Sequence, residues 1–201
     1  MKRIELSDIK NLIEYEKARP AFRSKVIEQK KDRRISVGDR ITLVFENRLS
    51  VLFQIQEMIR VERMVDNLKI QHEIDTYNEL VPGKNELSAT LFVEVEDQEM
   101  IKPVLDSLVG LNKESVYLKI ANDIIPAIFE EGHATDDRIS AVQYIKFKLN
   151  PAQIDKFRSN DVEIMLVIRH RNYNAQTNLP ENVRRALYHD LVDDGSENLW
   201  N

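Results

Sequence analysis

Glu62 is the residue of this sequence whose position points most directly to chemistry. The run from Ser50, its expected N-terminal cap, to about Val65 has the apolar spacing of an amphipathic helix. On a helical wheel of about 100° per residue, Glu62 lies within roughly 40° of Ile55 and Met58, inside the apolar stripe. A carboxylate that faces a core must be paired, be protonated or bind a cation, because desolvating it alone costs several kcal/mol. Glu62 is therefore predicted to be a buried acid.

The buried acid has two interpretations. We favour an ion pair with Arg48, Arg138 or Arg169, since structural pairs perturb acids as often as functional sites do. The alternative is a metal ligand or a general base. Either interpretation requires Glu62 to meet side chains from other parts of the chain.

The second half of a predicted helical hairpin brings further candidate ligands. The segment 68–80 fits one helical face, and Pro82-Gly83 supplies its end. Glu73 borders its apolar face, whereas His72 and Asp75 do not share a face, so we favour a solvated helix edge over a metal site here. The candidate metal ligands are Glu57, Glu62, His72 and Glu73.

Gln143 is a second polar residue at an expected core position. It lies on the otherwise apolar face of a strand predicted over 139–149 and needs buried hydrogen-bond partners there. A satisfied core amide would meet this need, and so would a ligand pocket containing a glutamate. The hypothetical pocket is lined by Arg48, Glu62, Glu73 and Gln143.

Two histidines, His170 and His133, have positions that suit catalysis or metal binding. His170 ends a strand predicted over 162–170, a place suited to acid–base catalysis, although its polar neighbours also fit an exposed turn. Glu130 and His133 have a Glu-x-x-His spacing, which holds metals when it lies on a helix. Gly132 and the strand pattern before it argue against a helix, so we discount this spacing.

The elements around these residues predict an α+β fold. Several predicted strands follow one another without the crossover helices that a parallel sheet needs, so we expect a mostly antiparallel sheet of five to seven strands. The helical hairpin and further helices should pack on it. Pro20 is expected to separate two N-terminal helices. We predict one globular domain over residues 1–192 and a disordered acidic tail over 193–201.

Composition narrows the class of protein. The chain has 201 residues, a net charge of −5 and no cysteine. The negative charge argues against nonspecific binding to nucleic acids or anionic membranes. Without cysteine there is no disulfide, thiolate metal site or thiol nucleophile. No apolar signal segment or membrane span is present, so we expect a cytoplasmic protein. The sequence also has no phosphate-binding glycine loop.

Six groups of residues, spread along the chain, form a recognisable set: Phe45-Glu46-Asn47-Arg48, Gln56-Glu57-Met58 with Arg60 and Glu62, His72-Glu73 with Asp75, Tyr77 and Asn78, Leu87-Ser88-Ala89-Thr90-Leu91, Asp137-Arg138 with Ser140 to Tyr144, and His170 with Tyr173. Together they resemble a bacterial protein family of unknown function over nearly the whole chain except the tail. Members of that family are often encoded beside rubrerythrin-like proteins and iron–sulfur or flavin oxidoreductases. The resemblance implies a role near peroxide or oxygen metabolism.

Two functions follow as hypotheses. The first is an accessory or binding protein for a redox partner, such as a rubrerythrin-like protein. The second is a metal-dependent enzyme with a carboxylate and histidine site, in which His170 acts as acid or base. The second requires the candidate ligands to converge within coordination distance, about 2.0–2.6 Å from a common point.

Overall fold

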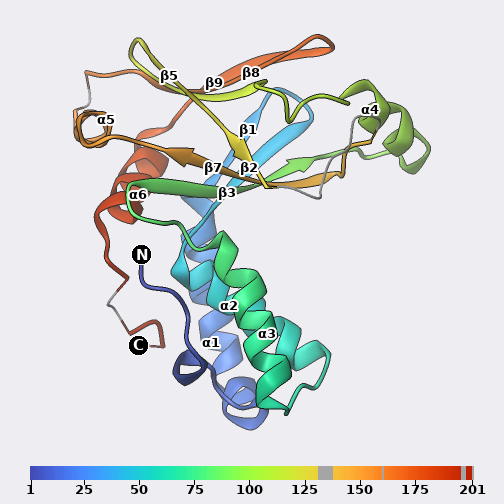
Figure 1. Cartoon of the computed structure of the whole chain (residues 1–201), viewed down its shortest axis with the longest axis vertical. Coiled ribbons are helices and arrows are strands. Elements are labelled where there is room, and N and C mark those ends of the chain that lie inside the picture. Colours follow the sequence, from blue (N-terminus) through green and yellow to red (C-terminus); the bar gives the residue numbers. More distant parts are fainter. Residues whose placement is uncertain (131–137, 160, 196–197, 201) are drawn as a thin grey trace.

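Two antiparallel β-sheets and a layer of helices make up the protein (Figure 1). The computed structural model describes residues 1–130, 138–159, 161–195 and 198–200. His133 and Asp137 lie outside the described residues. Within these ranges, the five-stranded sheet has the order β1 (Arg34–Val37), β2 (Ile41–Glu46), β3 (Glu86–Val93), β7 (Val142–Lys148) and β6 (Ile128–Phe129). The four-stranded sheet has the order β5 (Asp123–Pro126), β4 (Val116–Ile120), β8 (Ile164–His170) and β9 (Tyr173–Asn178).

The predicted α+β class and the antiparallel pairing are confirmed. The strands are shared between two sheets instead of forming one, because the apolar faces of both sheets pack against each other. Phe45 and Phe147 of the larger sheet and Leu118 and Leu166 of the smaller one belong to this core, and all four are at most 1% exposed.

The edges of the two sheets are joined on both sides of this core. On one side, the chain passes from β5 to β6 through Ala127, whose N–H donates to the Val116 carbonyl at 2.8 Å. On the other side, the Thr177 hydroxyl donates to the Ser36 carbonyl at 3.0 Å, which ties β9 to β1. These contacts link the two sheets at their edges.

The remaining elements are helical. They are η1 (Leu6–Asp8), α1 (Leu12–Lys31), α2 (Arg48–Val61), α3 (Asn67–Tyr77), η2 (Asn78–Leu80), η3 (Gln98–Met100), α4 (Ile101–Ser107), α5 (Pro151–Lys156) and α6 (Glu181–Val192). The first three α-helices pack on one another and extend away from the sheets along the long axis of the molecule (Figure 1). They enclose a second apolar cluster that includes Tyr15, Leu52, Ile55 and Ile74.

The helical hairpin is present as α2 and α3, with different ends from those predicted. Asn47, and not Ser50, caps α2: its side chain accepts from the Ser50 N–H, and the Ser50 hydroxyl accepts from the Asn47 N–H, both at 3.0 Å. The expected break at Pro20 is also wrong, because α1, which is 20 residues long, runs through this proline. Packing of its buried side chains Tyr15, Phe22 and Val26 compensates for the hydrogen bond that proline cannot make.

The described residues near the C-terminus make specific contacts with the N-terminal part of the chain. The Trp200 indole N–H donates to the Asp8 carbonyl at 2.9 Å, and its ring centroid lies 4.3 Å from that of Phe22. Closer to α6, the Lys2 N–H donates to the Asp194 carbonyl at 2.8 Å. The Trp200 ring thus packs on an apolar part of α1. Of the helices described, none combines the length and apolar character needed to cross a membrane.

Trp200 is half-buried and should be partly shielded from solvent in the folded protein. As the chain contains one tryptophan, intrinsic fluorescence reports on this residue alone. We expect blue-shifted emission and weak quenching by acrylamide, both lost on unfolding. Trp200→Ala should lower the free energy of unfolding, followed by circular dichroism, by about 1–3 kcal/mol. Native emission typical of free tryptophan, with a silent substitution, would show that the tail is disordered.

Candidate functional site

Glu62 is not a buried acid. Helix α2 ends at Val61, Glu62 is the C-terminal cap residue, and Arg63 takes a left-handed backbone conformation with φ of 53°. The wheel position derived for a longer helix therefore does not apply, and the Glu62 side chain is exposed to solvent. An exposed carboxylate needs no buried ion-pair partner.

Glu57 is engaged in an ion pair between α1 and α2. Its two carboxylate oxygens accept from the Arg19 guanidinium at 2.7 and 2.8 Å, and one also accepts from the Tyr15 hydroxyl at 2.7 Å. The hydrogen bonds from Arg19 hold the pKa of Glu57 below its ordinary value. Burial, together with the bond to Glu57, raises the pKa of Tyr15. These contacts make Glu57 a residue that joins two helices.

The other two candidate metal ligands, His72 and Glu73, do not form a metal site either. His72 is exposed, whereas Glu73 is half-buried beside Tyr77. Burial raises the pKa of Tyr77, and the nearby charge of Glu73 adds to this effect. In the ranges that the structure describes, no three histidine or acidic side chains are grouped closely enough to hold a metal ion.

Gln143 is buried, as its place in the sequence indicated. It is 1% exposed, and its side-chain amide donates to the Ser140 carbonyl at 2.9 Å. The side chain lies on the strand face that carries Ile145 and Phe147, which pack between the two sheets. Glu73 belongs to the helical layer, so the hypothetical pocket of Arg48, Glu62, Glu73 and Gln143 does not form as one site.

His170 holds a turn in place. The ring is buried, with Nε2 donating to the Val109 carbonyl at 3.1 Å and Nδ1 accepting from the Asn172 N–H at 3.3 Å. Gly110, directly after Val109, has φ of +93°, so this bond fixes the sharp turn that follows α4. Both ring nitrogens are occupied by backbone groups, which fits a structural role better than acid–base catalysis.

Arg48 and its neighbours surround a small polar cavity of about 70 Å³. The Arg48 guanidinium donates to the Asp8 carboxylate at 2.6 Å, and Asn47, Gln29 and Asp190 also line the space. Pockets for small molecules measure roughly 300–1,000 Å³, so this cavity suits a few water molecules only.

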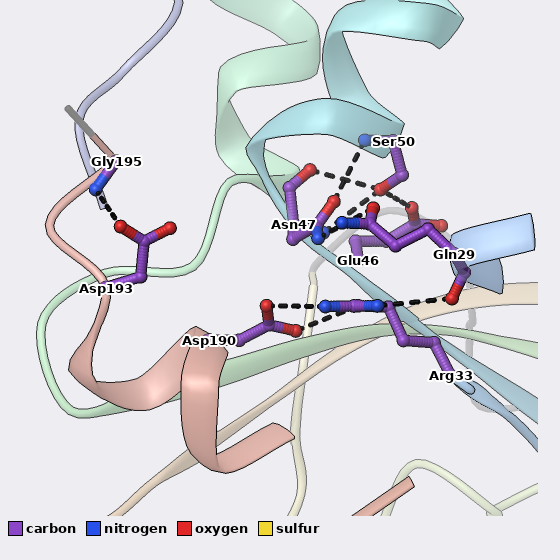
Figure 2. A network of polar contacts seen from close by, with 8 residues as sticks. All are labelled: Gln29, Arg33, Glu46, Asn47, Ser50, Asp190, Asp193 and Gly195. Atoms are coloured by element: carbon purple, nitrogen blue, oxygen red, sulfur yellow. Dashed lines mark hydrogen bonds and ion pairs between the residues drawn. The ribbon is translucent and has the colours of Figure 1, made fainter. Parts of the chain in front are cut away.

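Asp190, which lines this cavity, belongs to a buried ion pair that connects α6 to the rest of the protein (Figure 2). Arg33 donates to both carboxylate oxygens of Asp190, at 2.8 and 3.0 Å, and to the Gln29 carbonyl at 3.1 Å. Both side chains are about 95% buried or more. Burial raises the pKa of Asp190, and Arg33 and Asn47 act in the opposite direction. The pair compensates for part of the cost of burying both charges.

Glu46 is a buried acid that the sequence analysis missed. It is 3% exposed at the end of β2 and accepts from the Ser50 hydroxyl at 2.5 Å, the Thr90 hydroxyl at 2.8 Å and the Gln54 amide at 3.3 Å. These three hydrogen-bond donors to the Glu46 carboxylate are uncharged. The capping pair Asn47 and Ser50 was the signal that could have placed it, since this pair fixes where the strand turns into the helix.

A cavity of about 680 Å³ lies between the N-terminus, α5 and the end of α6. Its lining combines Lys2 and Lys84 with Asp155 and Asp193. Because charges of both signs are spread around it without converging, this cavity does not indicate one class of ligand.

A second large cavity, which we call the apolar groove, lies among η1, the start of α1 and the turn between α2 and α3. These segments are at the end of the helical layer that is farthest from the sheets (Figure 1). The groove measures about 570 Å³ and is lined mainly by apolar residues of these segments. These residues are Leu6, Ile9, Lys10, Asn11, Leu12, Ile13, Ile59, Met64, Val65, Asn67 and Ile70.

Large apolar side chains at and beside the groove face solvent. Ile13 is 72% exposed and Val65 is 81% exposed, and the nearby Val61 and Leu68 are 69% and 83% exposed. Clustered exposure of this kind marks interaction surfaces, whereas scattered apolar residues need no explanation. The groove is therefore the strongest candidate functional site among the residues that the structure describes.

The fold and this groove define a class: an α+β protein of two packed antiparallel sheets with a three-helix layer that ends in an apolar surface. The chain matches the family model described as "Protein of unknown function (DUF3501)" over residues 3–191, so it belongs to that family. A crystal structure of a novel protein of unknown function from Burkholderia pseudomallei K96243 is similar, with a TM-score of 0.87 and 29% identity. The match covers 94% of this chain and 100% of that one. No curated protein matches significantly. The resemblance to a family of unknown function is thereby confirmed.

Replacing Glu46 should cost stability where the same change at Glu62 does not. Glu46→Gln places an amide group against buried donors and should lower the free energy of unfolding by about 1–3 kcal/mol. Glu62→Gln, the matched control, should stay within about 0.5 kcal/mol of the wild type. Urea denaturation followed by circular dichroism measures both, and equal effects would contradict the structural assignment of the two acids.

Glu57 should stabilise the protein in a pH-dependent way. Its pKa is lowered in the folded state, so its contribution is present above the ordinary value of 4.5 and is lost as the pH falls through the folded value. The wild type should be more stable than Glu57→Gln at neutral pH, and this difference should shrink below pH 4.5. Denaturation curves over a pH series test this, and a difference that stays constant on acidification would refute it.

Proposed function

We propose that this protein is an accessory protein that binds a protein partner of a redox system through the apolar groove. The observation that carries the proposal is the exposure of Ile13 and Val65 beside a cavity of about 570 Å³. Removing apolar surface of this kind from water is favourable by about 25 cal/mol per Å², and interface cores are richer in apolar residues than the remaining surface.

The redox part of the proposal is supported by the family resemblance. Members of the family are expected to be encoded beside rubrerythrin-like proteins and iron–sulfur or flavin oxidoreductases. A rubrerythrin-like protein is therefore the first partner to test. The cytoplasmic location and the lack of nucleic-acid binding, both expected from the sequence, are part of the same proposal.

No specific observation on the described residues favours a metal-dependent enzyme. Glu57 is held by Arg19 and Tyr15, and His170 is held by backbone groups. The candidate ligands Glu62 and His72 are both exposed, and they do not form a group with other acids within the described ranges.

The proposal predicts that polar substitutions at the groove weaken partner binding. The probe is the purified rubrerythrin-like protein of the organism that encodes this chain, titrated in a calorimeter. Val65→Asp and Ile13→Asp should each raise the Kd by about tenfold or more, because an interface centre does not accept an unpaired carboxylate.

The matched control is Ile124→Asp. Ile124 is 51% exposed and lies on β5 of the smaller sheet, at the opposite end of the molecule (Figure 1). This variant should bind like the wild type, and all three variants should keep their cooperative thermal unfolding. Absence of binding by the wild type, or equal weakening by all three substitutions, would reject the proposal.

A further inference from the structure

Lys10 is the one charged residue among the described residues that line the apolar groove. We infer that the partner inserts an amphipathic helix whose apolar face fills the groove and whose flanking carboxylate pairs with Lys10. The inference rests on the proposed function and adds the chemistry of the partner. It depends on how firmly Lys10 is held and on what surrounds it.

The backbone of Lys10 is fixed by a buried glutamine. Gln56 of α2 is fully buried; its side-chain oxygen accepts from the Lys10 N–H at 2.7 Å, and its amide group donates to the Lys10 carbonyl at 3.2 Å. One buried side chain therefore satisfies both backbone groups of one residue. These two hydrogen bonds set the position of Lys10 relative to Ile59, which lies on α2 with Gln56 and lines the groove.

The side chain of Lys10 is also positioned. Its ammonium group lies over the Trp200 ring, 4.8 Å from the centroid, and Trp200 is held by the Asp8 carbonyl and by Phe22. A cation over an aromatic face is attracted to it while it keeps hydrogen-bonding capacity toward solvent. Lys10 therefore lines the groove as a residue whose backbone and ammonium group are both held in place.

The surroundings favour an acidic helix as the occupant. The groove lies among helical segments, and an amphipathic helix presents apolar side chains at positions i, i+3, i+4 and i+7 to such a surface. The lining contains no carboxylate, although the chain as a whole carries a net charge of −5. A carboxylate on the partner would meet a fixed cation, whereas a symmetric second copy would bring two Lys10 ammonium groups into one interface.

The test uses two designed peptides and the full chain. Each peptide has about 18 residues, leucine on one helical face and a fluorescein label, and its flanks carry either glutamate or lysine. Fluorescence anisotropy should give at least about fivefold tighter binding for the glutamate peptide. Lys10→Gln should remove this preference, and Lys10→Arg should retain it. Val65→Asp should weaken binding of both peptides.

Three results would overturn the inference. They are equal affinity for the two peptides, a preference that survives Lys10→Gln, and a dimer in sedimentation equilibrium that Val65→Asp dissociates while neither peptide binds. The inference and the proposed function fail separately. Calorimetric binding of the rubrerythrin-like protein that Val65→Asp weakens and Lys10→Gln leaves unchanged would reject the acidic helix alone. A peptide preference without any binding of that protein would reject the redox partner alone.

Discussion

The turn from β2 into α2 must satisfy its polar groups with almost no water, and much of the structure depends on how it does so. Glu46, Asn47, Arg48 and Ser50 are each at most 5% exposed. Exposed helix ends leave four N–H groups to solvent, but a buried end needs protein acceptors. The Asn47 and Ser50 side chains supply them, Glu46 accepts from Ser50, and Asn47 donates to Gln29 of α1 at 3.0 Å. The entry into the helical layer is therefore fixed in direction.

This fixed entry separates the protein into two apolar cores. One core lies between the sheets, and the other lies among α1, α2 and α3. The ion pair of Arg33 and Asp190 ties the start of β1 to α6 beside the junction (Figure 2). Because buried pairs repay only part of their desolvation cost, this contact specifies the arrangement of the elements more than it adds stability.

The apolar groove results from this geometry. Helices that extend away from the sheets have ends that no other layer covers, and the apolar residues there face solvent. The tail shields part of α1 through Trp200, next to the groove, and leaves the groove itself open. The groove is the surface through which we propose that this protein binds its partner, and Lys10 is the charged residue among those that line it.

The sequence by itself determined the features that depend on local interactions. Period-two alternation and direct strand succession gave the antiparallel α+β class, the 3.6-residue spacing gave the helical hairpin, and the apolar strand neighbours of Gln143 gave its burial. Tertiary structure alone decided the features that depend on distant segments. A helix end one residue before Glu62 turned a predicted core acid into an exposed one. Glu46 is buried by side chains of α2 and β3, and Trp200 is held by α1. The groove brings together residues from η1 to α3. These residues are exposed because no other layer covers them, and the complete fold decides which surfaces are covered.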